Sequence, residues 1–415
     1  MIGRLPARLA GAGLLVACGC SPAAGDAAAP TPLFDASVPA DGAITPGSNR
    51  VHAGAAPPVD SGVDDLGDSA GPWTALEPMA IAADGSAVDF RLPWGAGQAG
   101  VALAVSASPF QCFQLDSLTD DDGGVYVPPG QSGAYCTSCD QRVSVAAGGG
   151  LFVVPSRAGS FQPAGSLHAR FALRDCVTLT PATPATDGGA PPVLTLKEWP
   201  LGPSPARGTV RLRVIVTPAS VFYPSAADSA LDAALAAVND QLSVVGITAT
   251  WAEPSRLPAA AGSDATFSRG DPSPLVSLRG GDPGDEASIP VVLAGCLLLS
   301  DPLVGTPSEP LGYTPHIPGG AGPADAVYIK GSPCGTPQPI VENWTAEAFG
   351  RVAAHEIGHY LGLYHAVEAD GTMDQLPDTD AGNLMNYDPT VSTATGLTPE
   401  QGEVMRRHPF VSSMP

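Results

Sequence analysis

The chain has 415 residues and carries 19 Lys and Arg against 41 Asp and Glu, a formal net charge of −22. This charge argues against nucleic acid and anionic lipid head groups as partners, because both are themselves negative. The length favours two folded units joined by linkers. With 49 Gly, 45 Pro and only 14% charged residues, the composition is that of an extracellular protein of loops and strands rather than of a helical bundle.

The first residues have the layout of an export signal. Arg4 and Arg8 precede a short apolar run at 9–17, which is too short to span a membrane. The run ends in Leu-Val-Ala followed by Cys18, which resembles the bacterial lipobox. We therefore expect removal of residues 1–17, lipidation of Cys18, and an exported bacterial lipoprotein anchored at the cell envelope or cell surface. If the lipobox is not used, the protein is secreted.

Residues 18–71 consist mainly of Ala, Pro, Gly and Asp, so we expect a disordered tether. From 72 to 180 short alternating apolar runs, such as 101–105, 151–154 and 170–173, are separated by Gly, Asp and Pro. This spacing predicts an all-β, sandwich-like domain, and we see no catalytic pattern in it. A second Pro- and Gly-rich connector leads us to expect a linker over 181–206.

The remaining part, 207–415, has a different pattern of apolar residues. An alternating strand pattern at 209–216 is followed by apolar residues at 231, 235, 238, 242 and 245, which is helical spacing, and by a strand pattern at 247–251. This order predicts a β-α-β unit and a mostly parallel sheet. Apolar runs at 289–299 and 326–329 add strands, so the fold class of this part is α+β.

The cysteines suggest an oxidising compartment. Cys296 and Cys334 are the only two in the C-terminal part, so we expect them to form a disulfide. Pairing among the cysteines at 112, 136, 139 and 176 stays open, a redox or zinc role for the CxxC of 136–139 is a weaker alternative, and Cys20 is unassigned.

Three of the seven histidines fall within the eleven residues 355–365. Thr345 as N-cap and a four-residue apolar repeat from Phe349 to Leu361 predict a helix there. His355 and His359 then lie one turn apart on the same face, and Gly362 lets the chain turn so that His365 approaches the same ion. Three imidazoles with an open fourth position are the ligand set of catalytic zinc. Glu356 would act as general base on the zinc-bound water.

The full pattern, HExxHxxGxxH, is the signature of metzincin peptidases, and the chain resembles them at every fixed position. Asn-Leu-Met-Asn-Tyr at 383–387 resembles the metzincin Met-turn, which implies that Met385 is an apolar floor beneath the histidines and that Tyr387 stabilises the oxyanion. Both motifs are most similar to those of the pappalysin group. The resemblance covers about 209–409 and implies a twisted mixed sheet, an active-site helix, a Met-turn and a C-terminal helix.

The resemblance has three further implications. Pappalysin-like enzymes often bind calcium, for which Asp370, Asp374, Asp378 and Asp380 are candidate ligands, unless they form only a solvated acidic loop. Substrate would lie along an edge strand between Leu299 and Ile329, near Gly312. The pattern Thr-Pro-Glu-Gln at 398–401 predicts the start of the final helix.

These observations predict a zinc-dependent endopeptidase that hydrolyses peptide bonds of extracytoplasmic proteins, with a protein or peptide as substrate. A different class of function is a surface binding or adhesion lipoprotein that uses a metzincin scaffold and cleaves nothing. A zinc hydrolase of non-peptide amides is a third. Neither the substrate nor the oligomeric state is readable from the sequence.

Overall fold

The computed structural model describes residues 73–82, 85, 87–130, 141–184, 191–280, 287–300, 305–335, 345–369, 371–388 and 396–414. All of them belong to one unit, Leu33–Pro415. The tether, Cys18, Cys20, Cys136, Cys139 and Asp370 lie outside the described residues. Within the described part, every helix is too short or too polar to cross a membrane.

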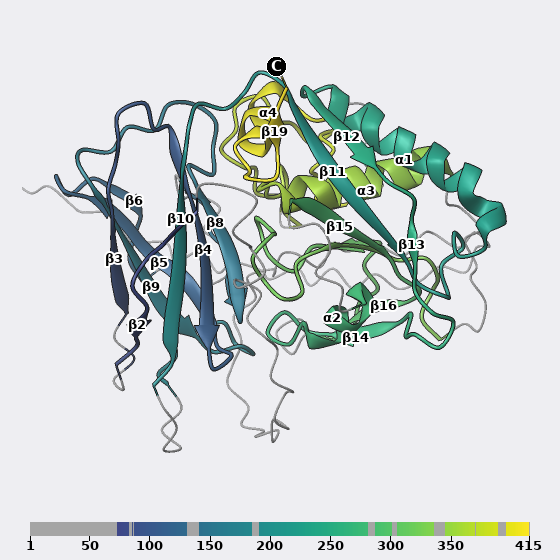
Figure 1. Ribbon diagram of the computed structural model, residues 1–415, viewed down its shortest axis with the longest axis horizontal. Coiled ribbons are helices and arrows are strands. Elements are labelled where there is room, and N and C mark those ends of the chain that lie inside the picture. Colours follow the sequence, from purple (N-terminus) through teal and green to yellow (C-terminus); the bar gives the residue numbers. More distant parts are fainter. Residues whose placement is uncertain are drawn as a thin grey trace, which may run out of the picture. The chain divides into compact units, whose positions relative to one another are not determined.

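The C-terminal part is built on a mostly parallel sheet (Figure 1). Its strand order is β12 (Ile247–Trp251), β11 (Gly208–Val216), β15 (Ser288–Leu293), β18 (Val327–Ile329) and β17 (Gly312–Tyr313). β17 is antiparallel and lies at the edge, where the sequence analysis expected the substrate strand. The short strands β13 (Ser255–Arg256) and β19 (Ser412–Ser413) also pair with β11, and β14 (Ala265–Phe267) pairs with β16 (Leu297–Leu299) apart from this sheet.

The side chains of the central strands point alternately into two apolar layers, one on each face of the sheet. Val214 of β11 and Val291 of β15 pack with α1 (Asp228–Ser243) and α3 (Ala346–Tyr360), which lie against each other on one face. Ile215 and Val292, each one residue further on, pack on the other face with α2 (Ser273–Arg279). Since successive strand residues point to opposite faces, both faces are covered. The last described helix is α4 (Pro399–Arg406), and a 3-10 turn (Ser225–Ala227) precedes α1.

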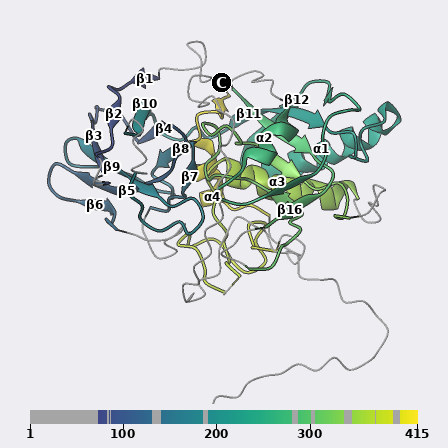
Figure 2. The ribbon, with the colours of Figure 1, turned by 90° about the horizontal axis from the view of Figure 1, so that it is seen from below.

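The N-terminal described part is all β, as predicted (Figure 2). One hydrogen-bonded path runs through β1 (Thr74–Ala75), β10 (Val193–Leu201), β4 (Gly100–Ser108), β8 (Gly149–Val154), β7 (Ala146–Ala147), β5 (Cys112–Asp120), β9 (Leu167–Arg174) and β3 (Val88–Leu92). β2 (Met79–Ala80) and β6 (Val125–Val127) join it at the sides. The ring centroids of Phe152 on β8 and Phe171 on β9 lie 5.3 Å apart although these strands do not pair, so the sheet folds over its own core.

The expected linker over 181–206 is wrong in its centre. Residues 193–201 form β10, which pairs along its whole length with β4. Its pattern Val-Leu-Thr-Leu-Lys-Glu-Trp alternates like a strand, and Leu194 and Leu196 are fully buried in the core of the ten-stranded sheet. The Pro-rich residues that precede this strand led the sequence analysis to extend the linker over it.

The apolar run 289–299 is likewise two strands rather than one. β15 ends at Leu293 and β16 begins at Leu297, in a different sheet. Between them the Cys296 N–H donates to the Asp264 carboxylate at 2.7 Å, and a Cβ at Gly295 would collide with that carboxylate. An apolar run alone does not reveal such a change of sheet, because both strands are buried.

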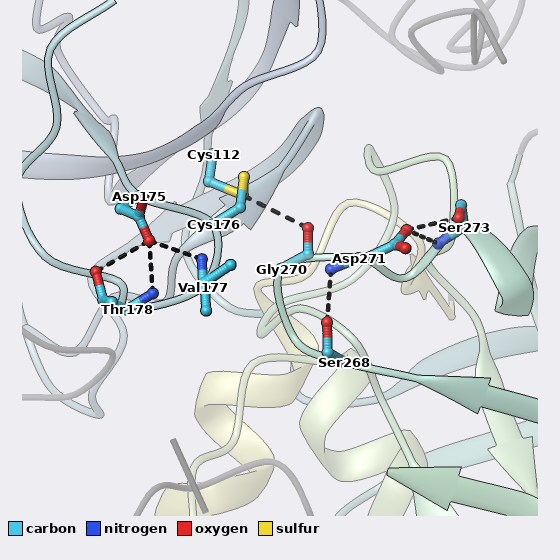
Figure 3. Close-up of a disulfide and its surroundings, with 9 residues drawn as sticks. All are labelled: Cys112, Asp175, Cys176, Val177, Thr178, Ser268, Gly270, Asp271 and Ser273. Carbon is cyan, nitrogen blue, oxygen red and sulfur yellow. Dashed lines mark hydrogen bonds between the residues drawn. A yellow bond between two sulfur atoms is a disulfide. The ribbon is translucent and has the colours of Figure 1, made fainter. Parts of the chain in front are cut away.

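Two disulfides join described cysteines. The predicted pair Cys296–Cys334 is present, with Cα atoms 4.9 Å apart. Cys112 pairs with Cys176, which settles part of the open pairing in the N-terminal part. Figure 3 shows this bond beside the turn that precedes α2, where the Cys112 sulfur lies 3.9 Å from the Gly270 carbonyl oxygen. A side chain at Gly270 would overlap the main chain of Cys176, so only glycine fits at this contact.

Candidate metal centre

The helix that carries the motif is capped and packed as its residues predict. The Thr345 side chain accepts a hydrogen bond from the Ala348 N–H at 3.1 Å, and the apolar stripe of Phe349, Ala353 and Ile357 enters the core. α3 ends at Tyr360, and Gly362 follows with a φ of +105°. The Leu363 N–H bonds back to the Gly358 carbonyl at 2.9 Å, a glycine-dependent helix ending that reverses the chain.

The structure brings the three predicted histidines together. His355, His359 and His365 are completely buried, and one potential ligand atom from each lies within 4.8 Å of the others. Their ring centroids are 4.6 to 5.5 Å apart. Among the described residues, this is the one group of His, Cys, Asp or Glu found suited to hold a metal ion.

Each of these rings is held through Nδ1. His355 Nδ1 donates to the Leu384 carbonyl at 2.8 Å, and His359 Nδ1 donates to the Leu363 carbonyl at 2.7 Å. Nδ1 of His365 lies 3.1 Å from Oε2 of Glu368. A proton kept on Nδ1 by an oxygen leaves the lone pair on Nε2, which is the form of imidazole that binds zinc. The site therefore fits a zinc ion with three neutral nitrogen ligands.

The predicted Met-turn lies directly against α3. Met385 is fully buried, and a Cβ at Gly358 would lie 2.7 Å from its sulfur, so the missing side chain at Gly358 makes room for it. The Met385 N–H donates to the Asn383 side chain at 2.8 Å, and Asn383 in turn bonds to Gln401 of α4. The predicted capping box of Thr398 and Gln401 is present, so α4 holds the turn whose Leu384 carbonyl orients His355.

Glu356 is 1% exposed and is oriented by Thr314, a residue that the sequence analysis did not single out. The Thr314 hydroxyl lies 2.8 Å from Glu356 Oε2 and 3.1 Å from the Glu356 carbonyl oxygen. Gly312, on the edge strand β17, lies so close that an added Cβ would be 2.6 Å from Oε1. The edge strand expected to bind substrate therefore runs beside the candidate base.

Glu368 and Arg142 also escaped the sequence analysis. The Arg142 Nη2 lies 2.5 Å from Glu368 Oε1, and both side chains are almost fully buried. Burial raises the pKa of Glu368, but the hydrogen bond from His365 and the charge and hydrogen bond of Arg142 outweigh it, so the pKa lies below its ordinary value. Glu368 follows His365 by three residues, so the sequence alone could have suggested it as a partner of that histidine. No feature of the sequence around Arg142 pointed to the site.

Tyr387 and two of the candidate calcium ligands, Asp374 and Asp378, form hydrogen bonds with nearby main chain. Tyr387 is half-buried, and its N–H donates to the Val367 carbonyl at 2.9 Å, which places it close to the ligand loop in the fold. Asp378 caps α4 through Thr398 and the Glu400 N–H. Asp374 accepts from Thr379 and the Leu376 N–H, and burial raises its pKa to about 6. These carboxylates support the loop itself, while the oxyanion role and calcium binding stay predictions.

No family model and no curated protein matches the sequence. Among solved structures, the crystal structure of metalloproteinase-II from Bacteroides fragilis is similar at 14% identity, covering 62% of this chain and 79% of that one, with a TM-score of 0.30. The functional assignment accordingly rests on the side chains of the site.

Proposed function

We propose that the protein is a zinc-dependent endopeptidase of the metzincin kind, closest in its motifs to the pappalysins, that hydrolyses peptide bonds of extracytoplasmic proteins. The observation that carries this proposal is the juxtaposition of three buried imidazoles, each oriented through Nδ1, with a buried carboxylate on the same helix. A site that served only as scaffold would not need the carboxylate. Its retention favours catalysis over the adhesion function.

His355, His359 and His365 would hold the ion. Bound zinc lowers the pKa of a coordinated water to about 7 and polarises a carbonyl. Glu356 takes the proton from the attacking water and passes it to the leaving nitrogen of the cleaved peptide bond. Thr314, by donating to Oε2, keeps the carboxylate in one orientation and lets the other oxygen, Oε1, face the edge strand. Tyr387 is the proposed oxyanion donor.

The test compares the purified wild type with Glu356→Gln and, as matched control on the same helix, the exposed Glu347→Gln. Each is incubated with a denatured protein mixture, with and without a zinc chelator, and new N-termini are sequenced. We expect the wild type and Glu347→Gln to cleave, zinc to restore chelated samples, and Glu356→Gln to bind zinc but lose about 10² to 10⁴ in rate. A wild type that holds one zinc yet produces no new N-termini would overturn the proposal in favour of binding or of non-peptide substrates.

We also propose that the mature protein begins at a lipidated Cys18 and reaches its substrates outside the cytoplasm. The lipobox-like sequence before Cys18 and the two disulfides support export. Mass spectrometry of the N-terminal peptide tests it: an acyl-modified Cys18 is expected, and an intact residue 1 contradicts it.

A further inference from the structure

The third histidine is held differently from the first two. His355 and His359 donate to main-chain carbonyls, which carry no net charge, whereas His365 contacts the Glu368 carboxylate. Glu368 is 4% exposed. A buried carboxylate is costly unless a cation and hydrogen bonds compensate it. The position of the His365 ring therefore depends on the cation that compensates the charge of Glu368.

That cation comes from the N-terminal part of the chain. Besides its bond to Glu368, the Arg142 guanidinium lies 3.4 Å from the His365 carbonyl oxygen and 4.3 Å from the centre of the Tyr364 ring. One side chain thus contacts three points of the ligand loop. It does so from 223 residues earlier in the sequence than His365.

The main chain around Arg142 is fixed as firmly as its side chain. The Arg142 N–H donates to the Ser156 hydroxyl at 2.8 Å, and the Ser144 hydroxyl donates to the Ile317 carbonyl at 2.9 Å. Tyr364 donates to the same Ile317 carbonyl at 3.2 Å. The segment that carries Arg142 and the Tyr364 ring next to its guanidinium are therefore both hydrogen-bonded to the Ile317 carbonyl of the C-terminal part.

The same two parts of the chain are in contact beyond this pair. Ala102 and Ala104 of β4 point away from the core of the ten-stranded sheet and are nevertheless fully buried, in a cluster that contains Ala321 of the C-terminal part and against which the partly buried Phe410 packs. A Cβ at Gly149 would lie 2.7 Å from the Ala321 carbonyl oxygen. Strands β4 and β8 of the N-terminal part are thus packed against the part that carries the metal site.

We propose that Arg142, in the segment just before β7, is a positioning residue of the metal centre: it holds Glu368 against His365 Nδ1, so that the N-terminal part of the chain completes the zinc site. The proposal rests on the proposed function for the identity of the ion. Its consequence is that the β sheet is a structural part of the peptidase and not only a separate binding module. Removing an outer partner of a metal ligand typically lowers metal affinity by about 10- to 100-fold.

The experiment measures the zinc dissociation constant of the full-length mature protein by competition with a chromophoric chelator at pH 7.5. The variants are Arg142→Met, Arg142→Lys, Glu368→Gln and the double variant Arg142→Met/Glu368→Gln. The matched control is Arg174→Met, because Arg174 is another buried arginine of the N-terminal part: it lies on β9, is 3% exposed and bonds to Asp116 at 3.1 Å and Gln114 at 3.0 Å. Circular dichroism and thermal unfolding of the zinc-free proteins report folding separately.

We expect Arg142→Met and Glu368→Gln each to raise the dissociation constant by about 10- to 100-fold, with Arg142→Lys less affected. The double variant should be no weaker than the worse single variant, because both changes break one chain of contacts. Arg174→Met should lose thermal stability and keep the wild-type constant. If Arg142→Met fails to fold, Arg142→Lys and Glu368→Gln carry the test.

The proposal is overturned if Arg142 and Glu368 variants bind zinc as the wild type does, or if Arg174→Met weakens zinc binding equally. Additive effects of Arg142 and Glu368 would also overturn it, since independent residues add. A wild type that binds no zinc contradicts the proposed function instead. The two failures are therefore distinguishable.

Discussion

The two sides of the candidate site are constructed in different ways. The side formed by α3 places His355, His359 and Glu356 by helix geometry alone, since residues one turn apart share a face. The other side consists of segments distant in sequence: Thr314 and Gly312 contact Glu356, Leu384 contacts His355, and Arg142 and Glu368 hold the loop of His365. The helix determines where the side chains of the candidate ligands and the candidate base begin, and the distant segments determine where their polar atoms point. The following predictions separate these two contributions.

The largest effect is expected at Gly312. In Gly312→Ala the new Cβ would displace the Glu356 carboxylate, because its three nearest neighbours are all side-chain atoms of Glu356. A misplacement of about 1 Å can cost roughly 10² in rate, so we expect about a 100-fold loss of peptidase rate with zinc affinity unchanged. Gly262→Ala, at a position where an added Cβ meets nothing within 4 Å, is the control and should behave as the wild type. Weaker zinc binding in Gly312→Ala would show that the base and the ligands are not separable.

The second effect concerns the segment from Gly312 to Gly319, whose residue Thr314 contacts Glu356. Its residue Gly319 accepts a hydrogen bond from His408 Nε2 at 3.0 Å, while His408 Nδ1 accepts from the Phe410 N–H at 3.1 Å. Burial of the ring lowers the pKa of His408 to about 4, against about 6.5 in the unfolded chain. The unfolded chain therefore binds more protons between these values, and stability present above pH 6.5 is lost as the pH falls to 4.

For His408 the loss amounts to at most about 3 kcal/mol of unfolding free energy. His408→Gln keeps polar groups but does not titrate, so between pH 7 and pH 4.5 it should lose less unfolding free energy than the wild type does. Denaturant titrations at both pH values measure this. Equal losses in the two proteins would mean that His408 does not contribute to the acid sensitivity.

The smallest effect is expected at Thr314. Thr314→Val keeps the shape of the side chain but removes the hydroxyl that contacts Glu356 Oε2. Losing one hydrogen bond to a charged group costs about 1.5–3 kcal/mol, of which only the part specific to the transition state lowers the rate, so we expect a loss of about 10-fold. The control is Thr217→Val, whose buried hydroxyl donates to the Leu293 carbonyl at 2.9 Å away from the site. It should reduce thermal stability alone, and an equal fall in activity would contradict an orienting role for Thr314.

Much of the local structure was predictable because its causes are local. The alternating residues of β11, the capping residues Thr345 and Thr398, and the helical stripe that ends before Gly362 are read directly from sequence. The pairing of Cys296 with Cys334 followed from their being alone in the C-terminal part. The expected linker and the undivided run 289–299 were wrong because they concern which strands pair, and strand pairing depends on residues far apart in the chain.

The sequence by itself determined the chemistry of the site: the spacing of three histidines and one glutamate on a helix and its glycine-ended turn leaves few other arrangements. Only the tertiary structure decided what surrounds those residues. Arg142 is one of 19 basic residues with no distinguishing neighbours in the sequence, and it gains a role only because folding buries it against Glu368. Buried charges must find partners wherever the fold provides them, and that requirement has no signature along the chain.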